Sequence, residues 1–265
     1  SMLWEHLRVK VFPQMFDELP HAYVLRAWVP ACSTGEEAYS LAIIFKEAIE
    51  KMKGNKNLTL QIFATDLDSG AIEQARKGVY PANIVTDIIP KRLSRFFVKH
   101  EDQYRVNSEI REMVVFAPQN VIKDPPFTKL DILTCRNMLI YMDTELQAKL
   151  LTLFHYSLNK KGIMVLGSAE TNNDDSGFFD TIDSKLRIYQ KIGIVKSEGL
   201  ANFPTAFAQT KASDSNKQTP VKVDDNIQSI TDNLLLQQFA PASVLVNAQG
   251  DIFYLTGNTG KYLTP

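Results

Sequence analysis

Cysteines and long apolar runs are scarce in this chain, and each shortage excludes a class of protein. Only Cys32 and Cys135 occur among 265 residues, which argues against a disulfide framework or a zinc site and favours a reducing cytosol. The apolar runs fall far short of the roughly 18 residues that cross a bilayer, and the N-terminus lacks the apolar core of a signal peptide. We therefore expect a cytoplasmic protein without direct membrane insertion.

An excess of charge of one sign is also lacking. Lys and Arg total 29 against 30 acidic residues, so the formal net charge is −1 and no overall positive field attracts nucleic acid. Gly and Pro number only 12 each and hydrophobic residues make up 45%, which indicates a globular protein with a packed core. The four histidines lack the spacing of metal ligands, so we predict no metal site.

From residue 24 onward, short apolar runs alternate with amphipathic helices, the pattern of a parallel sheet covered by helices on both faces. A capping box formed by Ser33 and Glu36 is predicted to start the first of these helices. Residues 79–112 interrupt the pattern with two strand-like runs, 95–99 and 103–107, on either side of His100, so we expect an inserted β-subdomain there. The predicted strands are 24–29, 58–65, 113–117, 130–135, 162–167 and 186–191, and the later helices are 69–77 and 143–159.

The two ends of the chain differ from this middle part. Residues 3–7 have a helical pattern without a cap, so we expect the natural chain to extend upstream. Residues 194–227 are polar and aperiodic, which predicts a linker. Residues 228–265 show a short apolar helix at 234–239 and a hairpin at 243–255. About 38 residues are too few for an independent core, so we expect the chain to stop inside a second domain.

Ligands of an open parallel sheet bind beyond the carboxyl ends of its strands. The turn after the first strand has one glycine, Gly35, and no phosphate-binding glycine motif, which argues against a pyrophosphate. Asp66 ends the second strand, where a carboxylate can accept both ribose hydroxyls. A nucleoside without phosphates fits best, and S-adenosylmethionine is one. Its carboxylate could use the helix N-terminus opened by Ser33 and Thr34.

Each of these residues also has a purely structural interpretation, and spacing alone leaves both open. Glu36 and Glu37 fit helix capping and compensation of the helix dipole. Asp66 fits an N-cap or an Asx-turn before the helix at 69–77. Asn120 fits a turn, and Tyr141 a core position.

In order, the motifs resemble those of the CheR family, chemotaxis receptor methyltransferases that use S-adenosylmethionine to methylate glutamate side chains. The matching segments are 28–42, 64–66, Asn120, 131–141 and 167–170, and the resemblance covers residues 3–193. It implies a Rossmann-like S-adenosylmethionine-dependent methyltransferase sheet of the α/β class, a small β-subdomain at 79–112 that can dock a receptor tail, and S-adenosylhomocysteine as product. It places Arg136 and Tyr141 in the methyl-transfer pocket. The cofactor contacts that it implies are Ala31, Cys32, Ser33, Thr34, Gly35, Glu36, Asp66, Asn120, Val121 and Asn137.

Residues 228–265 resemble the opening of a PAS sensor domain, an α+β fold, and their position resembles that in CheB-CheR-PAS fusion proteins. The resemblance implies a chemoreceptor cytoplasmic domain, or another protein carrying glutamates, as substrate, and dimerisation through PAS. The sequence departs from the family in three places. The family's Phe-Phe-Arg segment, thought to bind the methionine carboxylate, precedes residue 1. Ala31 replaces a frequent Gly, at small cost if its φ is negative, and Ala38 replaces a frequent Pro.

Two rival interpretations remain. Residues 124–127 match the Asp-Pro-Pro-aromatic motif of N-methyltransferases, although they precede the strand at 130–135 instead of following it, and they also fit a turn. The second rival is a non-catalytic S-adenosylmethionine-binding or docking module in a PAS-containing signalling fusion. Cofactor binding without turnover would distinguish the second rival from an enzyme, and an alkali-stable product would favour the first.

Overall fold

The computed structural model describes residues 2–52, 56–170, 177–192, 243–246 and 252–256. The chain divides into two units, residues 1–208 and residues 209–265. In the second unit, β11 (Ser243–Val246) pairs antiparallel with β12 (Ile252–Thr256), which confirms the predicted hairpin. The predicted linker at 194–227 and the predicted helix at 234–239 lie outside the described residues.

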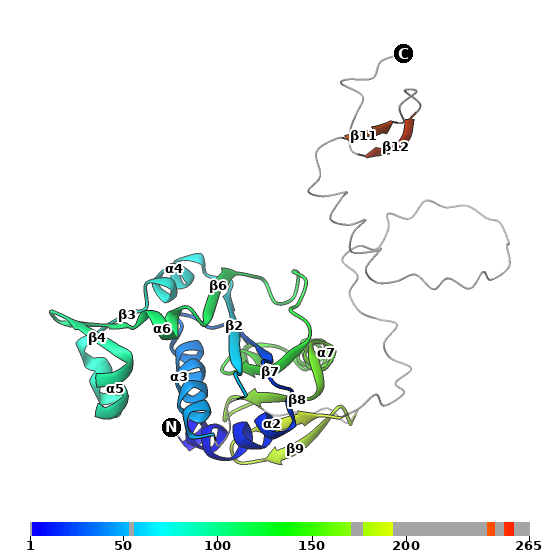
Figure 1. The fold of residues 1–265 in the computed structure, drawn as a ribbon. Helices are drawn as coiled ribbons and strands as arrows, with labels where there is room; N and C mark the ends of the chain where they lie inside the picture. The colour runs from blue at the N-terminus through cyan, green and yellow to red at the C-terminus, as the bar shows by residue number, and fades with distance from the viewer. Residues whose placement is uncertain (1, 53–55, 171–176, 193–242, 247–251, 257–265) are drawn as a thin grey trace. The chain divides into compact units, whose positions relative to one another are not determined.

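The first unit is built on a seven-stranded sheet with the order β6-β2-β1-β7-β8-β10-β9 (Figure 1). The strands from β6 to β8 are parallel, and β10 runs antiparallel to both of its neighbours. The order reverses between β1 and β7, which is the topological switch point where open α/β sheets bind ligands. The strands are β1 (Val24–Pro30), β2 (Thr59–Asp66), β6 (Val114–Pro118), β7 (Leu130–Cys135), β8 (Leu158–Leu166), β9 (Phe179–Asp183) and β10 (Ile188–Lys191).

Helices cover both faces of this sheet because successive side chains of its strands point to opposite faces. Ala27 of β1 and Ile132 of β7 belong to one core cluster, whereas Trp28 and Leu133 belong to the other. The first cluster contains side chains of α1 (Met2–His6), the π-helical turn Leu7–Val11, α2 (Phe12–Glu18), α3 (Glu36–Lys51) and α4 (Ser69–Lys77). The second contains side chains of α7 (Thr144–Ser157). None of the helices in the described ranges is both long and apolar enough to span a bilayer.

A separate three-stranded sheet lies between α4 and β6 in the chain. It has the order β3-β5-β4, from β3 (Val79–Pro81), β4 (Phe97–His100) and β5 (Gln103–Val106). Figure 1 shows it with α5 (Pro90–Phe96) to one side of the central sheet. The 3-10 turn Ala82–Thr86 precedes α5, and α6 (Ser108–Arg111) follows β5.

Two predictions about the boundaries of elements were wrong, and one strand of the central sheet was missed. Arg95 and Phe96 belong to α5 and not to a strand, because Pro90 starts a helix and Arg92 binds it to Glu47 of α3. The helix predicted to reach residue 159 ends at Ser157, where the Lys191 ammonium caps the carbonyls of His155 and Leu158. Strand β9 was not predicted, because its largely exposed sequence lacks an apolar run.

Candidate cofactor site

The turns at the carboxyl ends of β1 and β7 enclose a cavity of 410 Å³ beside the start of α3. Trp4 of α1 lies at its edge and places its ring 5.7 Å from the Arg136 guanidinium carbon. The structure thus brings together six of the predicted site residues in one cavity wall. Those six are Ala31, Cys32, Ser33, Glu36, Arg136 and Asn137, and Glu37 and Ser40 join them.

The turn after β1 has a strained backbone. Ala31 has φ +54°, Ser33 +48° and Gly35 +92°, so the chain enters the left-handed region three times within five residues. The replacement of a frequent Gly by Ala31 was expected to cost little stability if φ were negative. Because φ is positive, that expectation is wrong. The predicted capping box is also wrong: Gly35 is the N-cap, and α3 begins only at Glu36. The Thr34 hydroxyl donates to the Glu36 carboxylate instead, at 2.7 Å and 2.8 Å from its two oxygens.

This strain yields a prediction for Ala31. We expect Ala31→Gly to raise the free energy of unfolding by about 0.5–1 kcal/mol, because glycine adopts a positive φ without a clash at Cβ. Chemical denaturation measures the change. Ala71→Gly, inside α4, is the control and should lower stability by a similar amount. A loss of stability in Ala31→Gly would contradict the prediction.

Asp66 at the end of β2 holds the turn after β1, residues 31–35, in place. One of its carboxylate oxygens accepts a hydrogen bond from the Ser33 amide at 2.7 Å, and the other accepts one from the Asp68 amide at 3.0 Å. Asp68, not Asp66, is the N-cap of α4. Each oxygen of Asp66 keeps a second lone pair, so the carboxylate can still accept hydroxyl donors from a ligand.

Glu170, to which the sequence assigned no role of its own, organises the turn after β7. Its side chain is 3% exposed, and one oxygen accepts hydrogen bonds from the amides of Met138 and Leu139, both at 2.8 Å. The other oxygen accepts from the Gly167 amide at 2.6 Å. Glu170 therefore joins the turns after β7 and β8 and fixes the backbone next to Arg136 and Asn137. An acidic residue four positions after the end of the buried strand β8 was the sequence signal for this role.

Two unpaired polar atoms belong to residues that line the cavity. Glu37 Oε1 and Arg136 Nε are buried and have no hydrogen-bond partner among the described residues. Buried polar groups are almost always paired, so a group of such atoms beside a cavity indicates a polar ligand. Burial raises the pKa of the Glu37 carboxyl to about 7, although nearby Thr134 and Arg136 favour its ionised form.

The raised pKa of Glu37 predicts a pH-dependent stability. The native carboxyl keeps its proton to about pH 7, whereas the unfolded chain loses it near pH 4.3, so the native state binds more protons in between and stability falls as pH rises. Between pH 5 and pH 7 we expect the free energy of unfolding to fall by about 2 kcal/mol more in the wild type than in Glu37→Gln. Urea denaturation at several pH values measures this, and parallel profiles would contradict it.

The other predicted site residues do not line this cavity. Gly35 is buried against Ala75 and Phe116, and the carbonyl of Thr34 accepts a hydrogen bond from the Tyr80 hydroxyl at 2.9 Å. Asn120 forms a turn in which its side-chain oxygen accepts from the amides of Ile122 and Lys123. Val121 packs against the second core cluster.

Tyr141 is 83% exposed, so its structural alternative, a core position, is wrong. Two further large apolar side chains are exposed after parallel strands, Leu67 after β2 (72%) and Ile122 after β6 (47%). Sequence reasoning missed Leu67, although an apolar residue in a turn directly after Asp66 was a usable signal. These side chains offer apolar surface at the carboxyl edge of the sheet, where a flat base could pack.

Both cysteines are buried and free. Burial raises the pKa of the Cys32 thiol to about 12 and that of Cys135 well above its usual value. Cys32 therefore lines the cavity as a neutral thiol and is no nucleophile near neutral pH.

The sheet with its antiparallel β10 and the cavity at the switch point have the arrangement of a Rossmann-like methyltransferase fold. The family model "CheR methyltransferase, SAM binding domain" matches residues 1–188. The chain therefore belongs to the CheR methyltransferase family.

Curated relatives agree with this family. A chemotaxis protein methyltransferase of Escherichia coli is 33% identical over 154 residues, 55% of this chain and 51% of that protein. One of Borreliella burgdorferi is 29% identical over 177 residues, 64% of this chain and 62% of that protein. An uncharacterised 104.1 kDa protein of Rhodobacter capsulatus is 38% identical over 186 residues, 70% of this chain but 19% of that protein. The chain thus spans less than two thirds of each of these relatives.

Proposed function

We propose that the protein is an S-adenosylmethionine-dependent O-methyltransferase that converts glutamate side chains of chemoreceptors into methyl esters in chemotaxis-type signal transduction. The observation that carries this proposal is the convergence of Glu37, Arg136 and the turn at 31–36 on one cavity in a chain of the CheR family. Relatives named chemotaxis protein methyltransferases support the chemoreceptor as substrate.

The residues around the cavity fit the polar parts of the cofactor. Asp66 would accept the ribose hydroxyls through its free lone pairs. The unpaired oxygen of Glu37 would accept from the ammonium of the methionine part. Leu67 and the turn at Asn120 and Val121 would pack on or bind the adenine. When bound, S-adenosylmethionine supplies an electrophilic methyl group, and S-adenosylhomocysteine is the product.

The protein's own contribution to transfer is orientation of the acceptor. A glutamate carboxylate is ionised at pH 7, so it needs no general base. It needs alignment with the methyl carbon and protection from water. Arg136, whose Nε has no partner among the described residues, would hold one carboxylate oxygen while the other attacks. Tyr141, at the exposed end of the same segment, would contact the acceptor, and neither residue exchanges a proton.

The remaining parts of the chain receive roles by resemblance to the family. We assign residues 3–193 to the catalytic domain, with 79–112 as the β-subdomain that docks a receptor tail, residues 194–227 to a linker and residues 228–265 to the start of a PAS-like domain. In this proposal the protein acts in the cytoplasm, where the receptor's cytoplasmic domain is available, and dimerises through PAS.

The alkaline stability of the product tests the reaction type. The chain is incubated with S-adenosylmethionine that carries a tritiated methyl group and with a chemoreceptor cytoplasmic fragment, and the labelled fragment is then exposed to alkali. A glutamyl methyl ester releases volatile methanol, as we expect. A label that survives alkali would contradict the proposal and indicate N-methylation. Cofactor binding without any labelling would favour the docking-module alternative.

A further inference from the structure

The guanidinium of Arg136 lies at the cofactor cavity without an acidic partner. The side chain is half-buried, and its Nε has no hydrogen-bond partner among the described residues. Glu37 is close enough for its carboxyl to respond to the charge of Arg136, but no ion pair joins Arg136 to a carboxylate within the described ranges. The guanidinium carbon instead lies over the ring of Trp4, 5.7 Å from its centroid.

An aromatic partner suits an arginine that must bind a substrate carboxylate. The π electrons of an indole attract the charge of a guanidinium, and this attraction needs no hydrogen bond to an oxygen. A protein carboxylate, in contrast, would bind the same N–H groups that an acceptor carboxylate needs. The Trp4 ring can therefore hold Arg136 in place and leave its donors available.

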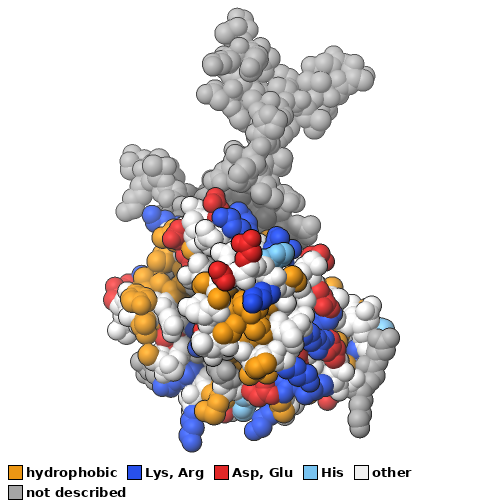
Figure 2. All heavy atoms as spheres, turned by 90° about the vertical axis from the view of Figure 1, so that its left-hand side faces the viewer, with side chains coloured by type: hydrophobic (Ala, Val, Ile, Leu, Met, Phe, Trp, Pro, Cys, Tyr) orange, Lys and Arg blue, Asp and Glu red, His pale blue; other side chains and the backbone are white. Residues whose placement is uncertain are grey.

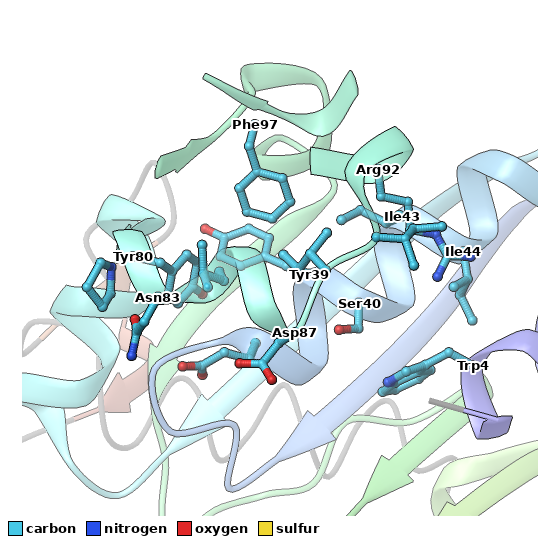
Figure 3. A pocket seen from close by; sticks show the side chains of 15 residues that line it. Trp4, Tyr39, Ser40, Ile43, Ile44, Tyr80, Asn83, Asp87, Arg92 and Phe97 are labelled. Atoms are coloured by element: carbon cyan, nitrogen blue, oxygen red, sulfur yellow. The ribbon is translucent and has the colours of Figure 1, made fainter. Parts of the chain in front are cut away.

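Trp4 is itself fixed by the core. Its side chain is 8% exposed and belongs to the first core cluster, together with Leu3 and Leu7. It lines the cofactor cavity and also a larger cavity of 680 Å³ between α3 and the segment from β3 to α5. Figure 3 shows the ring at one end of this larger cavity, with Tyr80 at the other. The indole therefore has a defined position beside Arg136.

Charged side chains anchor the helix that carries Trp4. The next residue, Glu5, accepts hydrogen bonds from Arg8 and, at 3.2 Å, from Arg92 of α5. Arg92 also donates two hydrogen bonds to Glu47 of α3, at 2.9 Å and 2.6 Å. Figure 2 shows acidic and basic side chains interspersed on the face of the molecule that carries α5. These bonds tie α1 to α3 and α5, so a displacement of the indole with its helix would break them.

We propose that Trp4 is a positioning residue for methyl transfer, which holds the Arg136 guanidinium where its free N–H groups meet the acceptor carboxylate. This inference rests on the proposed function and adds a residue to it. Trp4 acts through Arg136 and makes no bond to the acceptor. Without the ring, Arg136 keeps its charge but loses its fixed orientation, so a smaller fraction of bound acceptor is aligned with the methyl carbon. The loss therefore falls on kcat.

Single variants test the position of the ring. Trp4→Leu keeps a large apolar side chain but removes the π face, and we expect kcat with the chemoreceptor fragment to fall about tenfold. The Kd for S-adenosylhomocysteine should change by less than about twofold, because the proposed cofactor contacts are made by other residues. Trp4→Phe restores an aromatic ring and should recover most of the lost kcat.

The matched control is Leu3→Ala on the same helix. Leu3 is 7% exposed and belongs to the same core cluster, but it does not line the cofactor cavity. Its truncation should lower the stability to urea at least as much as Trp4→Leu does, while kcat changes by less than about twofold. An equal loss of kcat in Leu3→Ala and Trp4→Leu would show that any damage to this helix slows transfer, and the proposal would be wrong.

A double-mutant cycle shows whether Trp4 acts through Arg136. Tritium counting at high enzyme concentration follows the slow turnover of Arg136→Met. Once the guanidinium is gone, the ring has nothing to hold, so adding Trp4→Leu to Arg136→Met should change kcat by less than about twofold. A further tenfold loss in the double variant would overturn the proposal.

The outcomes separate this inference from the proposed function. If the wild type methylates the receptor fragment and Trp4→Leu keeps its kcat, or loses cofactor affinity in proportion to kcat, the role of Trp4 is wrong and the proposed function stands. If the wild type binds S-adenosylhomocysteine but methylates no receptor fragment, the proposed function is wrong and the role of Trp4 falls with it.

Discussion

Replacement of Glu170 by alanine is expected to lower the free energy of unfolding by about 3 kcal/mol and to abolish measurable cofactor binding. The substitution leaves the amides of Met138, Leu139 and Gly167 without their acceptor in a buried site. It also releases Asn137, which has a φ of +63° that its neighbours must impose. Arg136 and Asn137 then lose their fixed position at the cavity. Urea denaturation and titration with S-adenosylhomocysteine measure the two effects.

Asp131→Ala provides a matched control for Glu170→Ala. Asp131 is also a buried carboxylate with three donors, namely the Tyr23 hydroxyl, the Arg26 amide and the Asn159 side-chain amide. It lies near the amino end of β7, away from the cavity. We expect its removal to destabilise the fold comparably while the folded protein keeps its affinity for S-adenosylhomocysteine. Equal loss of affinity in both variants would show that Glu170 has no particular role at the site.

A second large effect is expected for Gly35→Ala, about 3 kcal/mol of lost stability. A Cβ at Gly35 would lie 3.0 Å from the Ala75 Cβ and 3.0 Å from the Phe116 ring, and the φ of +92° is unfavourable for alanine. The cost combines backbone strain of about 1–2 kcal/mol with overpacking of about 1–3 kcal/mol. Thermal or urea denaturation measures it.

Gly177→Ala separates the two contributions to the Gly35 effect. Gly177 also has a positive φ, +69°, but a Cβ there would meet nothing within 4 Å. This variant should therefore lose only the strain contribution, about 1 kcal/mol. If Gly35→Ala costs no more stability than Gly177→Ala, the close packing of Gly35 against Phe116 does not contribute to the cost.

The sequence was most informative where local pattern decides the structure. The apolar run of β1, the amphipathic α3 and the glycine that ends α4 follow from short-range periodicity and capping. The location of the site followed from the βα alternation, because parallel strands place their carboxyl ends at one edge. The resemblance to CheR then supplied the cofactor, which residue types and spacing alone left open.

The rest of the site depends on contacts that local pattern does not encode. The positive φ of Ala31 and Ser33 has no signal in residues that prefer negative φ, and the contact that holds the Ser33 amide comes from Asp66, 33 residues away. Glu170 reaches amides 31 and 32 residues earlier in the chain. Glu37 differs from Glu36 only in the side of α3 that it occupies, and that side makes Glu37 half-buried while Glu36 is exposed.

Calorimetric titration with S-adenosylhomocysteine, for the wild type and for Asp66→Ala, tests the central claim most directly. The claim is that the carboxyl ends of β1, β2 and β7 form a site for this cofactor. We predict one-to-one binding by the wild type and at least a hundredfold weaker binding by Asp66→Ala, because the variant loses both the ribose acceptor and the hydrogen bond to Ser33. Equal affinity in the two proteins, or no binding by the wild type, would contradict the claim.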